Sequence, residues 1–343
     1  MHGITRRHGL WAAIAVALAA ALVLTRLAWA SGSDWFSATG RYCAYSQHSV
    51  SRLANLGKLV GHTYDCSMLF NDEATNWDNW TNPWFTTSKG DQDWVSWKHA
   101  DPTRRMVISP GLVPANAPAD WRARGADGQY DSYYTALGQQ LVAAGMGDSV
   151  IRLAHEGNGN WQKFWFGDTG EQQRQWVSTW RHAVLAMRAV PNSSFVFDWN
   201  VAAGFDNVPL DWYYPGDDVV DVIGFDFYDL DQMAAGAPSG DPARWDQEYA
   251  RANGPAVMIA FADAHHKPIS IPEWGLVPMD RPAAPGGGDN PQFVDGISTI
   301  LANNRISYSG YFDDDVTGTR LPIGDAPRAL EAYRHQLQLR HRE

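Results

Sequence analysis

Two short segments of the sequence each place a glutamate directly after an apolar run. One is Ser149–Trp161, with the sequence SVIRLAHEGNGNW, and the other is Lys267–Gly275, with the sequence KPISIPEWG. Only seven of the 38 acidic residues are glutamates, and only Glu156 and Glu273 follow strand-like runs and are flanked by tryptophan and glycine. Two carboxyl groups that face each other beside aromatic rings are the arrangement that glycoside hydrolysis needs.

Metal chemistry finds no support in the sequence. The pair His155-Glu156 is not followed by a second histidine at HExxH spacing, and His265 and His266 are adjacent, so their side chains would diverge on a helix. The two cysteines of the chain are too few to bind zinc alone. We therefore expect no metal and no cofactor.

The composition favours a large domain that binds sugar. The chain has 343 residues and 45% hydrophobic content, which suits one α/β barrel or two smaller domains. Its net charge of -11 is a poor match for nucleic acid, whose phosphates require a basic surface. Seventeen tryptophans and 13 tyrosines are more than core packing needs, and flat aromatic rings stack on the apolar faces of sugars.

The elements that must position the two glutamates alternate between strand-like and helix-like runs. The strand-like runs are 41–46, 60–69, 105–112, 150–154, 195–200, 219–227, 268–272 and 306–312. The helix-like runs are 49–56, 91–98, 131–144, 171–189, 245–264, 290–303 and 326–339.

Eight β/α units predict a (β/α)8 TIM barrel that forms a single domain from residue 31 to residue 343. An open doubly wound sheet is the alternative, but it requires a glycine signature after the first strand. The run Gly286-Gly287-Gly288 precedes a helix instead, and we interpret it as a loop.

In such a barrel, functional residues lie at the carboxyl ends of the strands. Glu156 ends the fourth predicted strand and Glu273 the seventh, so both should point into one mouth. Asn200 ends the fifth strand and Tyr228 follows the sixth. Asp313–Asp315 follow the eighth strand and could be a solvated turn.

At these residues the sequence resembles glycoside hydrolase family 26, in the clan of retaining (β/α)8 glycosidases. The resemblance rests on the segments His155–Trp161 and Pro272–Gly275, is supported by Asp221–Tyr228, and extends from about Gly40 to Leu339. A histidine before the first glutamate is the more specific feature, because most of the clan has asparagine there.

The resemblance implies a role for each of several residues. Glu156 would be the acid/base and Glu273 the nucleophile, while Tyr228 would hold the nucleophile carboxylate. His155 would contact the sugar in the −1 subsite, and Trp161 would be the platform on which that sugar stacks.

We also expect Asn200 and Trp274 to contact the substrate, although Asn200 is as well suited to holding a loop. Gly157 departs from the family pattern, in which methionine is usual, and this leaves the identity of the sugar open.

The chemistry itself sets physical requirements. A proton donor must carry its proton at rest, so its pKa must be raised by apolar walls and by the charge of the other carboxylate. Trp161, Phe164 and Trp165 could form that wall beside Glu156. Retention of configuration requires the carboxyl groups to be about 5–5.5 Å apart, whereas inversion requires roughly 6.5–9.5 Å.

The first 30 residues have the pattern of a secretory signal peptide. Arg6 and Arg7 precede an apolar run, and Ala28-Trp29-Ala30 fits a small-x-small cleavage site. We therefore expect a secreted protein whose mature chain begins near Ser31, with an uncleaved membrane anchor as the alternative. In an exported chain, Cys43 and Cys66 should form one disulfide between the first two strands, the alternative being two buried thiols.

Together these patterns predict a secreted, retaining endo-β-glycosidase that acts on a polysaccharide, with β-1,4-mannan as the leading substrate. A β-1,3/1,4-glucanase or xylanase on the same scaffold is one alternative, and a catalytically silent carbohydrate-binding barrel is another. We expect a monomer that binds neither nucleic acid nor, once the signal is removed, a membrane.

Overall fold

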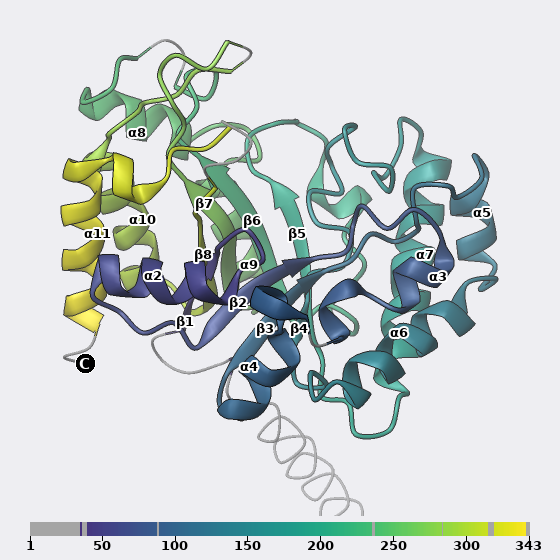
Figure 1. Cartoon of the computed structure of the whole chain (residues 1–343). Helices are drawn as coiled ribbons and strands as arrows, with labels where there is room; N and C mark the ends of the chain where they lie inside the picture. The colour runs from purple at the N-terminus through teal and green to yellow at the C-terminus, as the bar shows by residue number, and fades with distance from the viewer. Residues whose placement is uncertain are drawn as a thin grey trace, which may run out of the picture.

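The computed structural model describes residues 35, 40–87, 89–234, 237–282, 284–314 and 319–340. In these residues, eight parallel strands form a closed barrel in which each strand pairs with the next and β8 returns to β1. The helices surround the barrel (Figure 1). The predicted (β/α)8 fold is confirmed, and the open doubly wound sheet is wrong because this sheet has no edge.

The strands are β1 (Arg41–Tyr45), β2 (Cys66–Phe70), β3 (Arg105–Ser109), β4 (Val150–Ile151), β5 (Val196–Ala202), β6 (Val222–Tyr228), β7 (Ile269–Gly275) and β8 (Ile306–Phe312). The α-helices are α2 (Val50–Val60), α3 (Trp77–Thr81), α4 (Trp94–Ala100), α5 (Trp121–Ala126), α6 (Asp131–Ala143), α7 (Gly170–Arg188), α8 (Pro242–Tyr249), α9 (Pro255–Ala264), α10 (Pro291–Asn303) and α11 (Pro327–Arg340). Short 3₁₀ turns are η2 (Trp84–Thr86), η3 (Gly90–Gln92), η4 (Leu210–Trp212) and η5 (Ile323–Asp325).

Local sequence signals explain several helix boundaries. Thr169 caps α7 and exchanges hydrogen bonds with Gln172 in a capping box, and α8, α9 and α10 each begin with proline. Helix α2 continues to Val60 and ends at Gly61, which adopts the left-handed conformation that glycine tolerates. The predicted second strand is therefore wrong for residues 60–65, because the helix and its cap use the first of them.

Alternate residues of each strand point into the barrel and form layers there. The layer at the amino-terminal end is apolar and consists of Cys43, Cys66, Met68, Val107, Val150, Val196, Val222 and Tyr308. The Cys43–Cys66 disulfide joins β1 to β2 inside this layer, as the sequence predicts. The alternative of two buried thiols is wrong.

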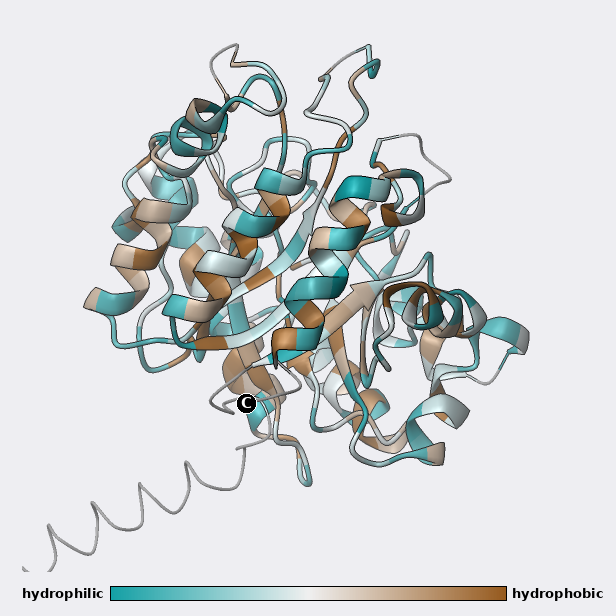
Figure 2. Cartoon of the chain, turned by 90° about the vertical axis from the view of Figure 1, so that its left-hand side faces the viewer, coloured by the Kyte–Doolittle hydropathy of each residue, from teal (hydrophilic) through white to brown (hydrophobic). Residues whose placement is uncertain are grey.

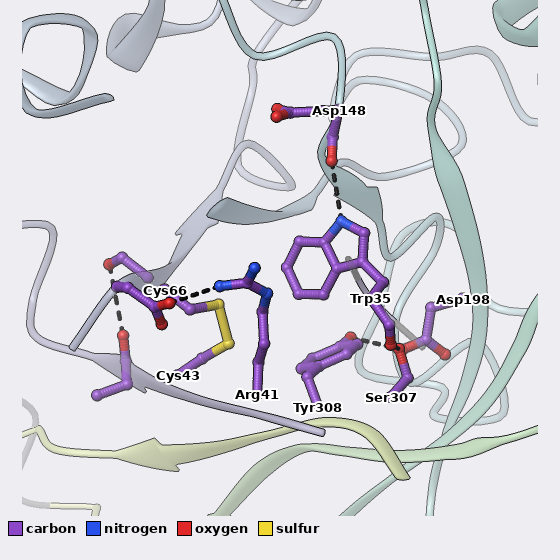
Figure 3. Close-up of a disulfide and its surroundings, with 11 residues drawn as sticks. Trp35, Arg41, Cys43, Cys66, Asp148, Asp198, Ser307 and Tyr308 are labelled. Carbon is purple, nitrogen blue, oxygen red and sulfur yellow. Dashed lines mark hydrogen bonds and ion pairs between the residues drawn. A yellow bond between two sulfur atoms is a disulfide. The ribbon is translucent and has the colours of Figure 1, made fainter. Parts of the chain in front are cut away.

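Trp35 lies against this layer (Figure 3). Its indole N–H donates to the carbonyl of Asp148, its own carbonyl accepts from Ser307, and its ring meets Tyr308 edge-on. The Arg41 guanidinium lies 5.6 Å from the centre of the Trp35 ring. The tryptophan thus ties the start of the described chain to three segments of the barrel.

The next layer toward the mouth is polar. Asp198 on β5 has no exposed surface and accepts hydrogen bonds from Ser270 on β7 and Tyr308 on β8. Burial raises the pKa of Asp198 to about 6, although both hydroxyl donors oppose that change. These side chains form a hydrogen-bonded layer beneath the mouth of the barrel.

The main hydrophobic core lies between the strands and the surrounding helices. It includes seven tryptophans that are at least 98% buried in the described structure, namely Trp80, Trp94, Trp121, Trp176, Trp180, Trp199 and Trp274. In Figure 2, the helices on the near side carry both hydrophilic and hydrophobic residues, as expected for helices that cover a sheet.

The predicted signal segment, residues 1–30, lies outside the described residues. Within the described part of the chain, no helix combines the length and hydropathy that a membrane crossing requires.

Candidate active site

Glu156 lies in a tight loop that follows the short strand β4. Ala154 and Glu156 both have positive φ angles, 53° and 49°, which non-glycine residues adopt only where the surroundings enforce them. The Glu156 backbone N–H donates to Asn200 Oδ1 at 2.9 Å, and Trp180 Nε1 donates to the carbonyl of Leu153 at 3.1 Å. These contacts hold the loop in the shape that aims Glu156 into the mouth.

Glu273 lies within β7 and is 6% exposed. The Tyr228 hydroxyl donates to its Oε2 at 2.8 Å, and Arg152 donates to its Oε1 at 2.6 Å. Its backbone N–H donates to Asp226 Oδ1 at 3.0 Å. Each carboxylate oxygen therefore has a donor, which fixes the group and stabilises its negative charge.

Arg152 is the centre of this network, and sequence reasoning missed it. Its side chain is completely buried and donates to Glu273, Asp226, Asn200 and Ser109. The residue interrupts an apolar run at a position that alternates with Val150, so it points into the barrel. A charged residue at an inward position was the available signal.

Glu156, Asp226 and Glu273 form a carboxylate cluster in which one oxygen of each lies within 4.8 Å of the others. Such a set would suit a cation, but the Arg152 guanidinium already binds Asp226 and Glu273 and supplies the balancing charge. The cluster is therefore explained by protein groups.

The surroundings of Glu156 favour its protonated form. Burial, followed by the negative charge of Glu273, raises the pKa of Glu156 to about 7. Three groups lower the pKa of Glu156 and so oppose this rise. The Trp161 indole N–H donates to Glu156 Oε2 at 2.9 Å, and the positive charges of Arg152 and Arg320 favour the ionised form. At neutral pH a large share of Glu156 carries a proton that it can donate.

His155 is 4% exposed, and its ring packs against Phe70 and Phe164. Burial, and then the charge of Arg152, places the pKa of His155 well below its usual value, so the imidazole is neutral. Its Nε2 lies 3.6 Å from Asp72 Oδ2 and 3.3 Å from Gln162 Nε2. His155 therefore presents a neutral polar group beside the two glutamates.

A cavity of about 810 Å³ opens beside Glu156 and Glu273. Its lining is mostly polar, with a few aromatic side chains among the polar ones. The lining residues are Tyr45, His48, Phe70, Asn71, Asp72, Glu73, Ala74, Thr75, Asn79, Asn82, Trp84, Gln92, His155, Glu156, Gln162, Glu273 and Phe312.

Of the five predicted substrate contacts, His155 lines this cavity, whereas Trp161, Tyr228, Asn200 and Trp274 are outside its lining. Trp274 has no exposed surface and packs against Tyr311 and Tyr333, because adjacent residues of a strand point to opposite faces and Glu273 points inward. The substrate contact predicted for Trp274 is therefore wrong. Asn200 is 2% exposed, and its side-chain amide hydrogen-bonds to Arg152, to Asp226 and to the backbone N–H of Glu156. The last of these bonds holds the Glu156 loop.

The predicted apolar wall also differs from the structure. Phe164 packs against His155, and Trp165 packs near Phe166 and Arg122. Trp161 does lie beside Glu156, but 51% of it is exposed and it makes a polar contact there. Burial of Glu156 thus does not depend on the three aromatic residues acting as one wall.

Comparison with known proteins agrees with this geometry. The model of glycosyl hydrolase family 26 matches residues 142–266, which include β4, its Glu156 loop, β5 and β6. Over these residues the chain is similar to glycosyl hydrolase family 26. Relatives include Endoglucanase H of Acetivibrio thermocellus, which is 26% identical over 219 residues, 62% of this chain and 22% of that protein.

A mannan endo-1,4-β-mannosidase of Bifidobacterium adolescentis is 26% identical over 159 residues, 45% of this chain and 15% of that protein. The chain thus aligns with less than a quarter of the length of either relative. Among solved structures, an endo-β-1,4-mannanase double mutant from Cellulomonas fimi has a TM-score of 0.60 and 16% identity. That match covers 87% of this chain and 70% of the other, and it supports the barrel fold.

Proposed function

We propose that this chain is a secreted, retaining endo-β-glycosidase of family 26 that hydrolyses β-1,4-mannan, with Glu156 as acid/base and Glu273 as nucleophile. The observation that carries the proposal is the approach of the two carboxyl groups, which have oxygens within 4.8 Å of each other. Retaining glycosidases place these groups about 5–5.5 Å apart, whereas inverting enzymes leave roughly 6.5–9.5 Å for a water molecule.

In the first step, Glu156 protonates the glycosidic oxygen while a Glu273 oxygen attacks the anomeric carbon. The bond to the leaving sugar breaks, and a covalent glycosyl–Glu273 ester forms. In the second step, the ionised Glu156 takes a proton from water, which attacks the same carbon and releases Glu273. Tyr228 and Arg152 stabilise the Glu273 carboxylate before the attack and after its release.

The cavity also bears on the class of polysaccharide. Among the described residues, its lining contains the carboxylates of Asp72, Glu73, Glu156 and Glu273 and no lysine or arginine. Like charges at a binding surface oppose association, so an uncharged polymer such as mannan fits better than a uronic acid polymer. The mannosidase from Bifidobacterium adolescentis supports mannan as the first substrate to test.

A β-glucanase is the second candidate, because one relative is Endoglucanase H. We propose export for either enzyme, since the Cys43–Cys66 disulfide suits an oxidising compartment and the N-terminal sequence has the pattern of a signal peptide. We also propose a monomer, because one chain supplies all the site residues described above.

The test begins with soluble mannan, β-glucans and xylan as substrates. Glu273→Ala should abolish hydrolysis, and azide should restore part of it with a product of inverted anomeric configuration, since the lost carboxylate leaves room for an external anion. If Glu273→Ala remains as active as the wild type, the assignment of the nucleophile is wrong. If wild type cleaves only a glucan, the glucanase candidate replaces the mannanase.

A further inference from the structure

An arginine in the segment after β8 lies on the tyrosine that holds the proposed nucleophile. The guanidinium carbon of Arg320 is 3.6 Å from the centre of the Tyr228 ring and 5.8 Å from the centre of the Phe312 ring. Contacts between other arginines and rings in the described residues span 4.6–5.8 Å. Arg320 therefore stacks directly on Tyr228 in a close cation–π contact.

The backbone beside Arg320 is held by the barrel. Leu321 donates its N–H to the carbonyl of Leu276 at 2.9 Å, and its own carbonyl accepts from the Tyr311 hydroxyl at 3.1 Å. Leu276 directly follows β7, and Tyr311 lies in β8. Arg320 is thus tied, through its neighbour, to the strand that carries Glu273.

The contact changes the electrostatics of Tyr228. Burial raises the pKa of the Tyr228 hydroxyl, the positive charge of Arg320 opposes that rise, and the negative charges of Glu273 and Asp226 add to it. A cation on the ring face draws electron density from the phenol oxygen, so the hydroxyl becomes a stronger donor. That hydroxyl donates to Glu273 Oε2 at 2.8 Å, so the charge of Arg320 reaches the proposed nucleophile through Tyr228.

Two arginines thus influence Glu273 in different ways. Arg152 donates directly to its Oε1, whereas Arg320 acts on the donor to its Oε2. Arg320 is not among the residues that line the 810 Å³ cavity, so a contact with substrate does not account for its position. The contact with Tyr228 does account for it.

We propose that Arg320 is a positioning residue for the reaction, because its stacked positive charge strengthens the hydrogen bond from the Tyr228 hydroxyl to Glu273 and keeps that hydroxyl aimed at the carboxylate. The inference rests on the proposed glycosidase function and deepens it. It adds a residue from the β8 end of the barrel to a site otherwise built from β4, β5, β6 and β7.

The two chemical steps should depend on this hydrogen bond unequally. In the first step the Glu273 carboxylate becomes an ester, which is a poorer acceptor, so a strong donor gives no advantage. In the second step water attacks the anomeric carbon, the bond to the Glu273 oxygen breaks, and its electron pair returns to the carboxylate. A strong donor stabilises that departing charge, so Arg320 should support the second step.

The two steps are measured separately with 2-deoxy-2-fluoro-β-mannobiosyl fluoride. The reagent esterifies Glu273, and its ring fluorine slows the release. The loss of activity on reaction therefore reports the first step, and the return of activity after removal of the reagent reports the second. We expect Arg320→Met to slow the return about 10-fold and the loss by less than about threefold.

Three more comparisons show whether the charge acts through Tyr228. Arg320→Lys keeps the charge, so its activity should return at least about threefold faster than that of Arg320→Met. In a Tyr228→Phe background there is no hydroxyl to strengthen, and Arg320→Met should slow the return by less than about twofold. Arg104→Met is the matched control, because Arg104 lies 4.6 Å from the Trp97 ring centre just before β3, and both steps should keep wild-type rates.

The cycle also separates Tyr228 from Glu156. The charge of Arg320 lowers the pKa of Glu156, and an effect through that acid would persist without the Tyr228 hydroxyl. The role of Arg320 is overturned if Arg320→Met slows both steps equally or leaves the second unchanged, if the slowing persists in Tyr228→Phe, or if Arg320→Lys is no faster than Arg320→Met.

Two further checks keep the test interpretable. If Arg320→Met does not fold, Arg320→Gln, which removes the charge and keeps a planar polar group, replaces it in every comparison. Wild-type hydrolysis is measured first, and its absence on mannan, β-glucan and xylan refutes the proposed glycosidase. If wild type cleaves only a glucan, the matching glucosyl reagent is used. An active wild type with an unchanged second step in Arg320→Met refutes only the role of Arg320.

Discussion

The charge of Glu273 should control the protonation of Glu156, and this coupling can be measured directly. Their nearest oxygens lie within 4.8 Å of each other. Two unit charges at that separation interact by about 3 kcal/mol at an effective dielectric constant of about 20, which equals about 2 pKa units. Glu273→Gln removes the charge and keeps the shape, so the pKa of Glu156 should fall by about 2 units from its value of about 7.

The assay is a ¹³C NMR titration of the glutamate carboxyl groups, which is feasible because the chain has only seven glutamates. Loss of one resonance in Glu156→Gln assigns the signal. Asp72→Asn is the control, because Asp72 lines the same cavity but faces His155, and the Glu156 midpoint should then move by less than about 0.5 unit. A Glu156 midpoint unchanged in Glu273→Gln would show that burial alone raises this pKa.

The same coupling has a kinetic consequence. Glu156 must be protonated to donate, so kcat/KM should decline as the pH rises through about 7. When Glu273 becomes an ester in the covalent intermediate, its charge is absent and the pKa of Glu156 should fall. Glu156 then loses its proton at the stage when the reaction needs a base, without any movement of the protein.

Three further predictions concern other parts of the structure. Arg152→Met should lower the free energy of unfolding by about 3–5 kcal/mol in urea denaturation, because it leaves buried carboxylates unpaired. Arg174→Met should leave the free energy of unfolding nearly unchanged, because its ion pair with Glu171 is exposed. Equal losses in the two variants would contradict the central role of Arg152. Trp161→Phe removes a donor from Glu156, so the basic limb of the kcat/KM profile should move up by about 0.5–1 pH unit, and a downward move would refute the contact. Reduction of Cys43–Cys66 should cost about 3 kcal/mol for a 23-residue separation, and alkylation of both thiols in the native protein would contradict the bridge.

The barrel and the positions of both glutamates could be predicted because they depend on local patterns. Alternating strand and helix runs specify the eight units, and a polar residue at the end of an apolar strand points into the mouth. The disulfide was predicted from the expected export and an even cysteine count. None of these required knowledge of which side chains meet across the barrel.

The rest of the site depends on long-range contacts. Arg152 sits in an apolar run, and its importance arises from groups 74 and 121 residues away. The error at Trp274 was avoidable, because the residue after an inward-facing glutamate in a strand must point outward. Arg320 carries no local signal, since its position on Tyr228 is set by bonds from Leu321 to Leu276 and from Tyr311 to Leu321.

The disulfide joins the two strands that share the fewest residue pairs. β1 and β2 are matched at one position, Ala44 with Ser67, whereas β1 and β8 are matched at five. A closed barrel can open only where two neighbouring strands separate, and the pair of strands with the fewest matched residues is expected to separate first. The Cys43–Cys66 disulfide holds β1 and β2 together covalently at this position. If the disulfide were cut and β1 separated from β2, β1 would lie at one edge of an open sheet and β2 at the other, and these edges would be the first to exchange their amide protons and to pair with other chains.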